Sequence, residues 1–162
     1  MTYLGPGSVF GSDGRLAWGQ SSRGWSHGRC TVGIRLLSAF RGFLRVGLFG
    51  GSLAGADYEE LIRPVPDGSE VFWDLVEYPW NDRLSVRCRQ HRWVFEAPNP
   101  PCWAVGSRLW LQLDVDTGEV RLRVDDTDFG VVAAVPVPLA RPVFPAFILS
   151  ALGACDAVFE LL

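Results

Sequence analysis

The stretch RLWLQLDVDTGEVRLRV, residues 108–124, alternates apolar and polar side chains on both sides of a short polar turn. The apolar positions, which we expect to face a core, are Leu109, Leu111, Leu113, Val115, Val120, Leu122 and Val124. The intervening positions, which we expect to face solvent, are Trp110, Gln112, Asp114, Asp116, Glu119, Arg121 and Arg123. A period of two is that of a β-strand, and Gly118 supplies the positive φ that a tight hairpin loop usually needs. The stretch therefore predicts a β-hairpin with one buried face.

Short segments rich in Val, Leu, Phe and Trp recur along the chain, separated by Gly, Pro, Asp and Ser. They cover residues 15–20, 30–38, 43–49, 70–76, 83–88, 91–96, 109–115, 119–124, 129–135, 143–149 and 155–161. No segment carries a sustained helical stripe of apolar residues, which argues against a helical bundle. Strands at this spacing predict an all-β fold, an antiparallel sandwich or barrel. The stretch GPGSVFG, residues 5–11, lacks the setting of a phosphate-binding loop and is expected to be a flexible lead-in.

Length and charge narrow the class of protein. A chain of 162 residues suits a single domain spanning residues 1–162. The net charge is −3 and the arginines are scattered, so the sequence predicts no nucleic-acid partner. The most apolar tract, residues 131–155, is too broken to form a membrane span. The residues that interrupt it are Pro136, Pro138, Arg141, Pro142 and Pro145.

Cysteine and lysine usage bear on location. The four cysteines are Cys30, Cys88, Cys102 and Cys155, and their wide spacing does not suggest a disulfide framework. The first residues, MTYLGPGSVFG, lack a basic start followed by an apolar block, so we expect no signal peptide and an intracellular, cytoplasmic location. All 15 basic residues are arginine. A GC-rich coding sequence explains this bias; a lysine-free surface would also suit a protein that works beside ubiquitin ligases.

Motifs for metal binding are weak. His27 with Cys30 and Cys88 with His91 have spacings that zinc ligands use, but residues three apart on a strand point to opposite faces. The DVDTGE string, residues 114–119, lacks the later ligands of a calcium-binding EF-hand loop. We therefore expect a solvated acidic turn there and no metal.

Motifs for catalysis are equally weak. GGSLAG, residues 50–55, has alanine where a nucleophile elbow needs its last glycine. Glycoside hydrolysis needs two carboxylates facing one another across a cleft, and the candidates along the chain are Glu59, Glu60, Glu77 and Glu96. Spacing in sequence does not place any two of them together.

Five segments follow one another in a recognisable order. They are GWSHGRCTVGIRLL (24–37), FLRVGLFGG (43–51), SEVFWDL (69–75), LWLQLDVDTGEVRLRVDDTDFG (109–130) and PVPLARPVFPAFIL (136–149). In order and spacing they resemble the strands of the SPRY domain family, which also occurs as the PRY-SPRY unit of tripartite-motif proteins. The positions that match the family's motifs are Ser26, Gly28, Arg29, Trp73, Asp114 and Gly118. Those that depart from them are Thr31, Val32, Gly33, Leu122 and Asp125.

The resemblance spans roughly residues 8–161 and has consequences for fold and function. It implies a bent antiparallel β-sandwich of the concanavalin-like SPRY type that binds other proteins through loops at one edge. It also implies no cofactor and no catalysis. The chain would then be a recognition module or adaptor, in ubiquitin-ligase or innate-immune pathways.

Aromatic residues between the expected strands are the best candidates for partner binding. Trp18, Trp73 and Trp110 fall within strand patterns and are expected to pack. The residues around Pro79 form an aromatic surface with a polar rim, as binding hot spots do, and are Tyr78, Trp80, Asn81, Asp82 and Arg83. Further candidates are Tyr58, Trp93 and Trp103. The loops expected to contact a protein or peptide are residues 50–60, 77–83, 97–104 and 125–129.

Two other functions use the same features. In a carbohydrate-binding or glycoside-cleaving jelly roll, the tryptophans would stack on sugar rings. In a capsid-like or scaffold sandwich, exposed aromatic residues would mediate self-assembly. The strand pattern is common to all three, because a fold does not fix a function.

Overall fold

The computed structural model describes residues 2–4, 9–12, 16–38, 42–50, 76–77, 85–88, 93–96, 105–135, 137–139, 141–151 and 157–161. Side-chain burial is described for residues 19–38, 46–48, 105–135, 137–139 and 141–147. All regular structure in these ranges is β-strand. The strands are β1 (Thr2–Leu4), β2 (Val9–Ser12), β3 (Leu16–Ser21), β4 (Arg29–Leu36), β5 (Gly42–Gly50), β6 (Val76–Glu77), β7 (Ser85–Cys88), β8 (Trp93–Glu96), β9 (Arg108–Asp114), β10 (Glu119–Val124), β11 (Thr127–Ala134), β12 (Val143–Ala151) and β13 (Ala157–Leu161).

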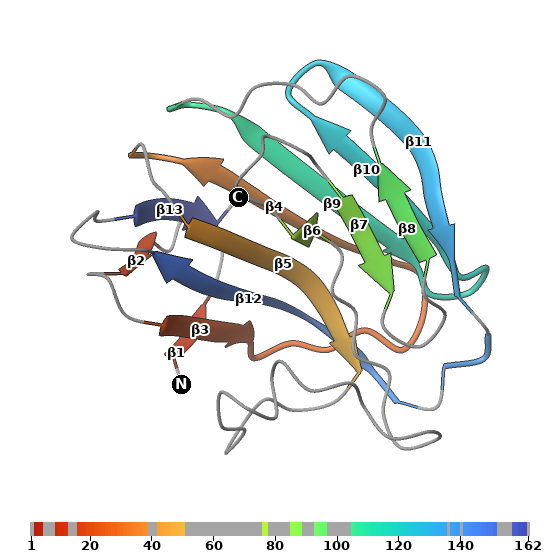
Figure 1. Cartoon of the computed structure of the whole chain (residues 1–162). Coiled ribbons are helices and arrows are strands. Elements are labelled where there is room, and N and C mark those ends of the chain that lie inside the picture. The colour runs from red at the N-terminus through yellow and green to blue at the C-terminus, as the bar shows by residue number, and fades with distance from the viewer. Residues whose placement is uncertain are drawn as a thin grey trace.

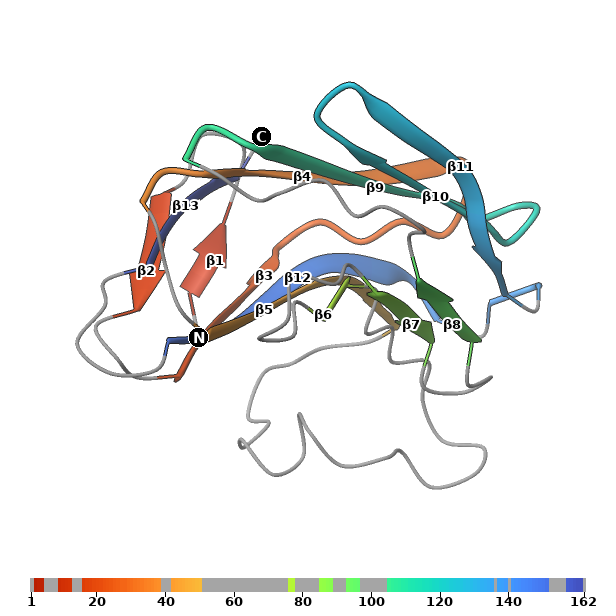
Figure 2. The ribbon, with the colours of Figure 1, turned by 45° about the horizontal axis from the view of Figure 1, so that its top comes forward.

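The strands form two sheets that face one another (Figures 1 and 2). A seven-stranded sheet has the order β1-β3-β12-β5-β6-β7-β8, and a six-stranded sheet has the order β11-β10-β9-β4-β13-β2. Every pairing is antiparallel except that of β1 with β3. The expected antiparallel β-sandwich is confirmed, with one parallel pair that the strand pattern did not predict.

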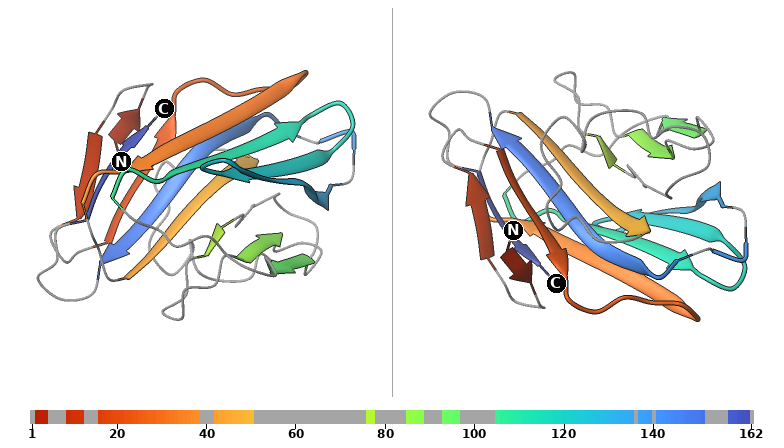
Figure 3. Two further views of the ribbon diagram at one scale, coloured as in Figure 1. Left: turned by 90° about the horizontal axis from the view of Figure 1, so that it is seen from above. Right: turned by 90° about the horizontal axis from the view of Figure 1, so that it is seen from below.

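Neighbouring strands in each sheet are often distant in sequence. In the seven-stranded sheet, β12 lies between β3 and β5. In the six-stranded sheet, β4 lies between β9 and β13. Seen from above and below, β7 and β8 lie at the end of the sandwich where β10 and β11 lie (Figure 3). The hairpin of residues 108–124 therefore forms part of one sheet near the edge where the two layers approach.

The hairpin has the predicted burial. Strand β9 alternates buried and partly exposed positions from Leu109 to Asp114, and strand β10 alternates in the same way. Leu111 pairs with Leu122, and Gly118 has φ +77° in the turn between the strands. The side chains of the two arms that were expected to face a core are all buried. They pack with Val46, Leu48 and Phe147 of the facing sheet, in a core that also contains Val32 and Ile34 of β4.

One detail of the strand prediction needs correction, and another is tested only at its end. The stretch 5–11 was expected to be a flexible lead-in, but its residues 9–11 belong to β2, which pairs with β13. The pairing places Phe10 opposite Phe159, a long-range partner that the local sequence does not reveal. The segment predicted at 70–76 is described only at its end, in β6, and residues 70–75 lie outside the described part of the chain.

No helix among the described residues has the length and apolar character that a membrane crossing requires.

Candidate functional site

The outer face of the six-stranded sheet carries its polar side chains in rows that cross β4, β9, β10 and β11. The register of the strands aligns one row as Gly33, Trp110, Arg123 and Asp128. The adjacent row is Thr31, Gln112, Arg121 and Val131. These positions alternate with the buried leucines of the hairpin. Because successive side chains of a strand point to opposite faces of the sheet, the rows face solvent when the leucines face the core.

A groove of about 260 Å³ lies along these rows and is open to solvent. The side chains that line it and carry its chemistry are Thr31, Trp110, Gln112, Arg121, Arg123 and Asp128. We call this surface the Trp110 groove. It combines an indole, two guanidinium groups, an amide, a hydroxyl and one carboxylate, so it offers apolar surface together with hydrogen-bond donors and acceptors.

Trp110 owes its position to a glycine on the neighbouring strand. A side chain at Gly33 would overlap the six-membered ring of the indole, so only glycine lets the ring lie across β4. Gly33 is buried and Trp110 is half-buried. Trp110 therefore packs, as expected from its place in a strand, but it packs on the outer face and forms one wall of the groove.

Hydrogen bonds hold the polar groups of the groove. Gln112 Nε2 donates to Thr31 Oγ1 at 3.1 Å, which joins β9 to β4. Arg123 Nε donates to the carbonyl oxygen of Asp125 at 2.9 Å. Asp128 Oδ1 accepts from the backbone of Gly130 at 2.8 Å. These contacts fix the side chains before a ligand binds, which lowers the entropy that binding must overcome.

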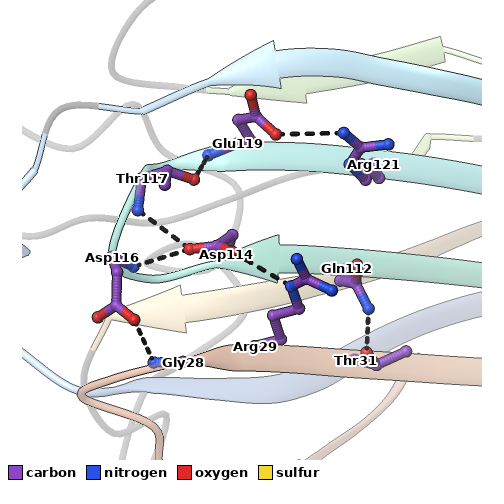
Figure 4. A network of polar contacts seen from close by, with 9 residues as sticks. All are labelled: Gly28, Arg29, Thr31, Gln112, Asp114, Asp116, Thr117, Glu119 and Arg121. Atoms are coloured by element: carbon purple, nitrogen blue, oxygen red, sulfur yellow. Dashed lines mark hydrogen bonds and ion pairs between the residues drawn. The ribbon is translucent and has the colours of Figure 1, made fainter.

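The turn between β9 and β10 is tied to the start of β4 by a second set of polar contacts (Figure 4). Asp114 Oδ1 accepts from the backbone N–H groups of Asp116 and Thr117, and its other oxygen lies 3.3 Å from Arg29 Nε. Asp116 Oδ2 accepts from the backbone of Gly28 at 3.0 Å. The hydrogen bonds from Thr117, with those from Arg29 and Asp116, hold the pKa of Asp114 below its usual range. The carboxylates of this turn thus bind backbone amides and an arginine.

The groups considered for metal binding are placed as follows. Cys30 is fully buried in the core, where burial raises the pKa of its thiol to about 12. His27 is largely exposed and its imidazole lies 3.9 Å from Asp116. Within the ranges that the structure describes, no three His, Cys, Asp or Glu side chains gather as metal ligands do. His91 lies outside those ranges.

Most of the residues predicted to bind a partner lie outside the described residues. These are Tyr58, Tyr78, Trp80, Asn81, Asp82, Arg83 and Trp103. Trp93 begins β8, and its backbone pairs with Cys88.

One predicted loop is described, and it adjoins the groove. Residues 125–129 contain the turn from β10 into β11, in which Asp125 has φ +49°. Arg108 N donates to Asp125 Oδ1 at 2.7 Å, and Asp125 N donates to Arg108 O at 2.8 Å. Asp128, from the same predicted loop, lines the groove. The groove itself was not predicted, although the outward positions of Trp110 and the two arginines were.

Comparison with known proteins gives matches of structure alone. No protein-family model matches the chain, and no curated protein matches it. The SPRY domain of human HERC1 is 15% identical, with a TM-score of 0.55 over 94% of this chain and 86% of that one. The TRIM65 PSpry domain is 14% identical, with a TM-score of 0.55 over 90% of this chain and 70% of that one.

A third solved structure is an enzyme, LamAcat from Zobellia galactanivorans. It is 16% identical, with a TM-score of 0.50 over 88% of this chain and 64% of that one. Identities this low establish a shared fold and leave activity open. The likeness to the HERC1 and TRIM65 domains confirms the architecture that the sequence motifs suggested. The chain has a SPRY-like β-sandwich fold.

Proposed function

We propose that the chain is a non-catalytic module that recognises a protein or a short extended peptide. The observation that carries this proposal is the likeness to the HERC1 and TRIM65 domains over at least 90% of the chain. The resemblance of the sequence to the SPRY family implies protein binding through loops at one edge of the sandwich. The chain would act as an adaptor, because loops at the edge of a sandwich provide a surface that binds a partner and does not catalyse a reaction.

The position of one predicted loop supports this proposal. Asp125, in the predicted loop 125–129, is hydrogen-bonded to Arg108 at the start of β9. Val105 is 61% exposed at this end of the sheet. Protein interfaces have an apolar centre and a polar rim, and an exposed apolar side chain beside a turn rich in aspartate has the same combination.

Composition supports a place for the module in the cell. The chain has no lysine and no disulfide framework in its cysteine spacing, which suits an intracellular protein that works beside ubiquitin ligases or in innate-immune pathways. A lysine-free module can remain bound to a ligase without being ubiquitinated on lysine.

Trp80→Ala is expected to lower partner binding at least tenfold, because a desolvated tryptophan supplies a large share of the affinity of such interfaces. The measurement is affinity purification with wild type and variant, followed by mass spectrometry and titration of the co-purified protein. Val137→Ala, which truncates an exposed apolar side chain elsewhere, is the matched control. Equal binding by Trp80→Ala and wild type, with unchanged circular dichroism, would contradict the assignment of Trp80.

The likeness to LamAcat favours one alternative, a carbohydrate-binding or glycoside-cleaving domain. In that case the tryptophans would stack on sugar rings instead of anchoring a peptide. A glycan array separates the two functions. Dose-dependent sugar binding that is lost in Trp80→Ala would replace the proposal of a protein partner.

A further inference from the structure

We propose that the Trp110 groove is a binding site in its own right, for an extended segment of a partner protein that carries an acidic side chain. The inference rests on the proposed function for the class of partner, since both sites would bind protein. It differs in the residues that carry it, because the described side chains that line the groove belong to β4, β9, β10 and β11.

The size of the groove suits a short extended segment. Its rows cross β4, β9, β10 and β11, and three spacings between adjacent strands amount to about 14 Å. An extended chain rises about 3.3 Å per residue, so about four residues fit along the rows. A volume of about 260 Å³ lies below the range of about 300–1,000 Å³ usual for small-molecule pockets. A segment laid along the open groove fits this shape better than an enclosed small molecule.

The charge of the lining favours an acidic ligand. Two arginines, Arg121 and Arg123, line the groove with one carboxylate, that of Asp128. Arg123 uses Nε for its contact with Asp125 O, so its terminal nitrogens remain to donate to a ligand. A guanidinium group pairs with a carboxylate through two parallel hydrogen bonds, which gives both strength and direction.

Arg121 is also able to exchange its partner. Its Nη2 lies 3.3 Å from Glu119 Oε2, and both side chains are about half exposed. An exposed ion pair of this kind contributes about 0–1 kcal/mol, since water screens it. Replacing Glu119 by a carboxylate of the ligand therefore costs little.

Trp110 and Gln112 supply the remaining contacts. The indole is half-buried and is seated on Gly33, so it presents apolar surface with little freedom left to lose. Gln112 donates through Nε2 to Thr31, which directs its Oε1 to act as an acceptor for a backbone N–H group. An aliphatic side chain on the indole and a carboxylate on the arginines would use both halves of the groove.

The same lining argues against a neutral sugar. An aromatic ring with amide and hydroxyl groups suits a sugar, but two guanidinium groups gain their full value only from an anionic partner. The argument therefore favours the acidic peptide, and sugar binding becomes an outcome that the experiment detects.

The test is binding of short immobilised peptides of matched length that carry glutamate, lysine or only neutral residues beside an aliphatic residue. The wild-type protein is expected to bind the glutamate peptides at least tenfold more tightly than the others. Arg123→Glu is expected to abolish this preference, and Trp110→Ala is expected to weaken the binding of all the peptides, because each of them carries the aliphatic residue. Arg108→Glu makes the same change of charge on the same face of the sheet, in β9 and outside the described lining, and should retain the preference.

Several results would overturn the inference. Equal binding of acidic and neutral peptides would do so, as would full binding by Arg123→Glu, a change at an exposed position that the fold tolerates. Binding of a neutral glycan that is lost in Trp110→Ala would assign the groove to sugars.

Trp80→Ala separates the two proposals, because binding of acidic peptides to the groove is expected to survive this substitution. If Trp80→Ala abolishes binding of a partner protein and the wild-type protein binds no acidic peptide, the proposed function is supported and the groove site is contradicted.

Discussion

Leu111→Ala is expected to lower the free energy of unfolding by about 2–5 kcal/mol, the usual cost of removing a fully buried leucine side chain. Leu111 has no exposed surface and lies in β9, which has a partner strand on each side. It pairs with Val32 of β4 and Leu122 of β10, so the cavity would open in the middle of the core. A urea titration followed by tryptophan fluorescence measures the change.

Val131→Ala is the matched control for this prediction. Val131 lies on the same sheet but is 47% exposed, so its truncation should change the free energy of unfolding by no more than about 0.5 kcal/mol. The account of the core would be wrong if the two variants were destabilised equally. It would also be wrong if Leu111→Ala were as stable as wild type, since the side chain would then not be buried.

Gly118→Ala is expected to destabilise the protein by about 3 kcal/mol or more, from two separate causes. Gly118 has φ +77°, a left-handed conformation that costs an L-residue about 1–2 kcal/mol. In addition, a Cβ atom would overlap the carbonyl oxygen of Val135. Relieving that overlap would strain the 2.9 Å hydrogen bond from Val135 N to Gly118 O, which joins the turn to the end of β11.

Gly130→Ala separates these two causes. Gly130 has φ +67°, yet a Cβ atom there would meet nothing within 4 Å. It should therefore lose only the conformational part, about 1–2 kcal/mol. Thermal and urea unfolding of both variants provide the comparison. Equal losses would show that the overlap with Val135 contributes nothing.

The part of the fold that could be predicted is the part that short stretches of sequence specify by themselves. Residues 108–124 carry both signals of a hairpin, alternation and a turn glycine, and the hairpin formed with the predicted buried and outward faces. Strand β2 was missed because it is four residues long and contains a glycine, and its partner lies at the far end of the chain. The parallel pairing of β1 with β3 was missed for the same physical reason: burial of long-range contacts decides it.

The candidate site was likewise predictable only in part. The outward direction of Trp110, Arg121 and Arg123 follows from period two and was predicted. The groove depends on which strand lies beside β9, and alternation contains no such information. Glycine at position 33 was noted only as a departure from the family motif, yet it is what allows the indole to lie across β4. A search for a glycine opposite an outward tryptophan would have found the site once the register was known.

The pairing of β4 with β9 is the claim on which both the sandwich and the groove depend, and a cross-strand disulfide tests it directly. Thr31 lies opposite Gln112, although the two are far apart in the sequence. Hydrogen bonds from Val115 N to Gly28 O and from Leu36 N to Ser107 O place this pair at a position without mutual backbone hydrogen bonds. At such positions the Cα atoms are about 4.5 Å apart, within the range for a disulfide.

The measurement is the mass and the non-reducing mobility of Thr31→Cys/Gln112→Cys after mild oxidation, in a chain whose Cys88, Cys102 and Cys155 are replaced by serine. Thr31→Cys/Arg121→Cys is the control, because Arg121 lies in the same row but one strand further away, with β9 between. We predict rapid, complete intramolecular bonding between positions 31 and 112 and none between positions 31 and 121. Failure of the first pair to bond, or equal bonding of both pairs, would contradict the proposed order of the sheet and the groove with it.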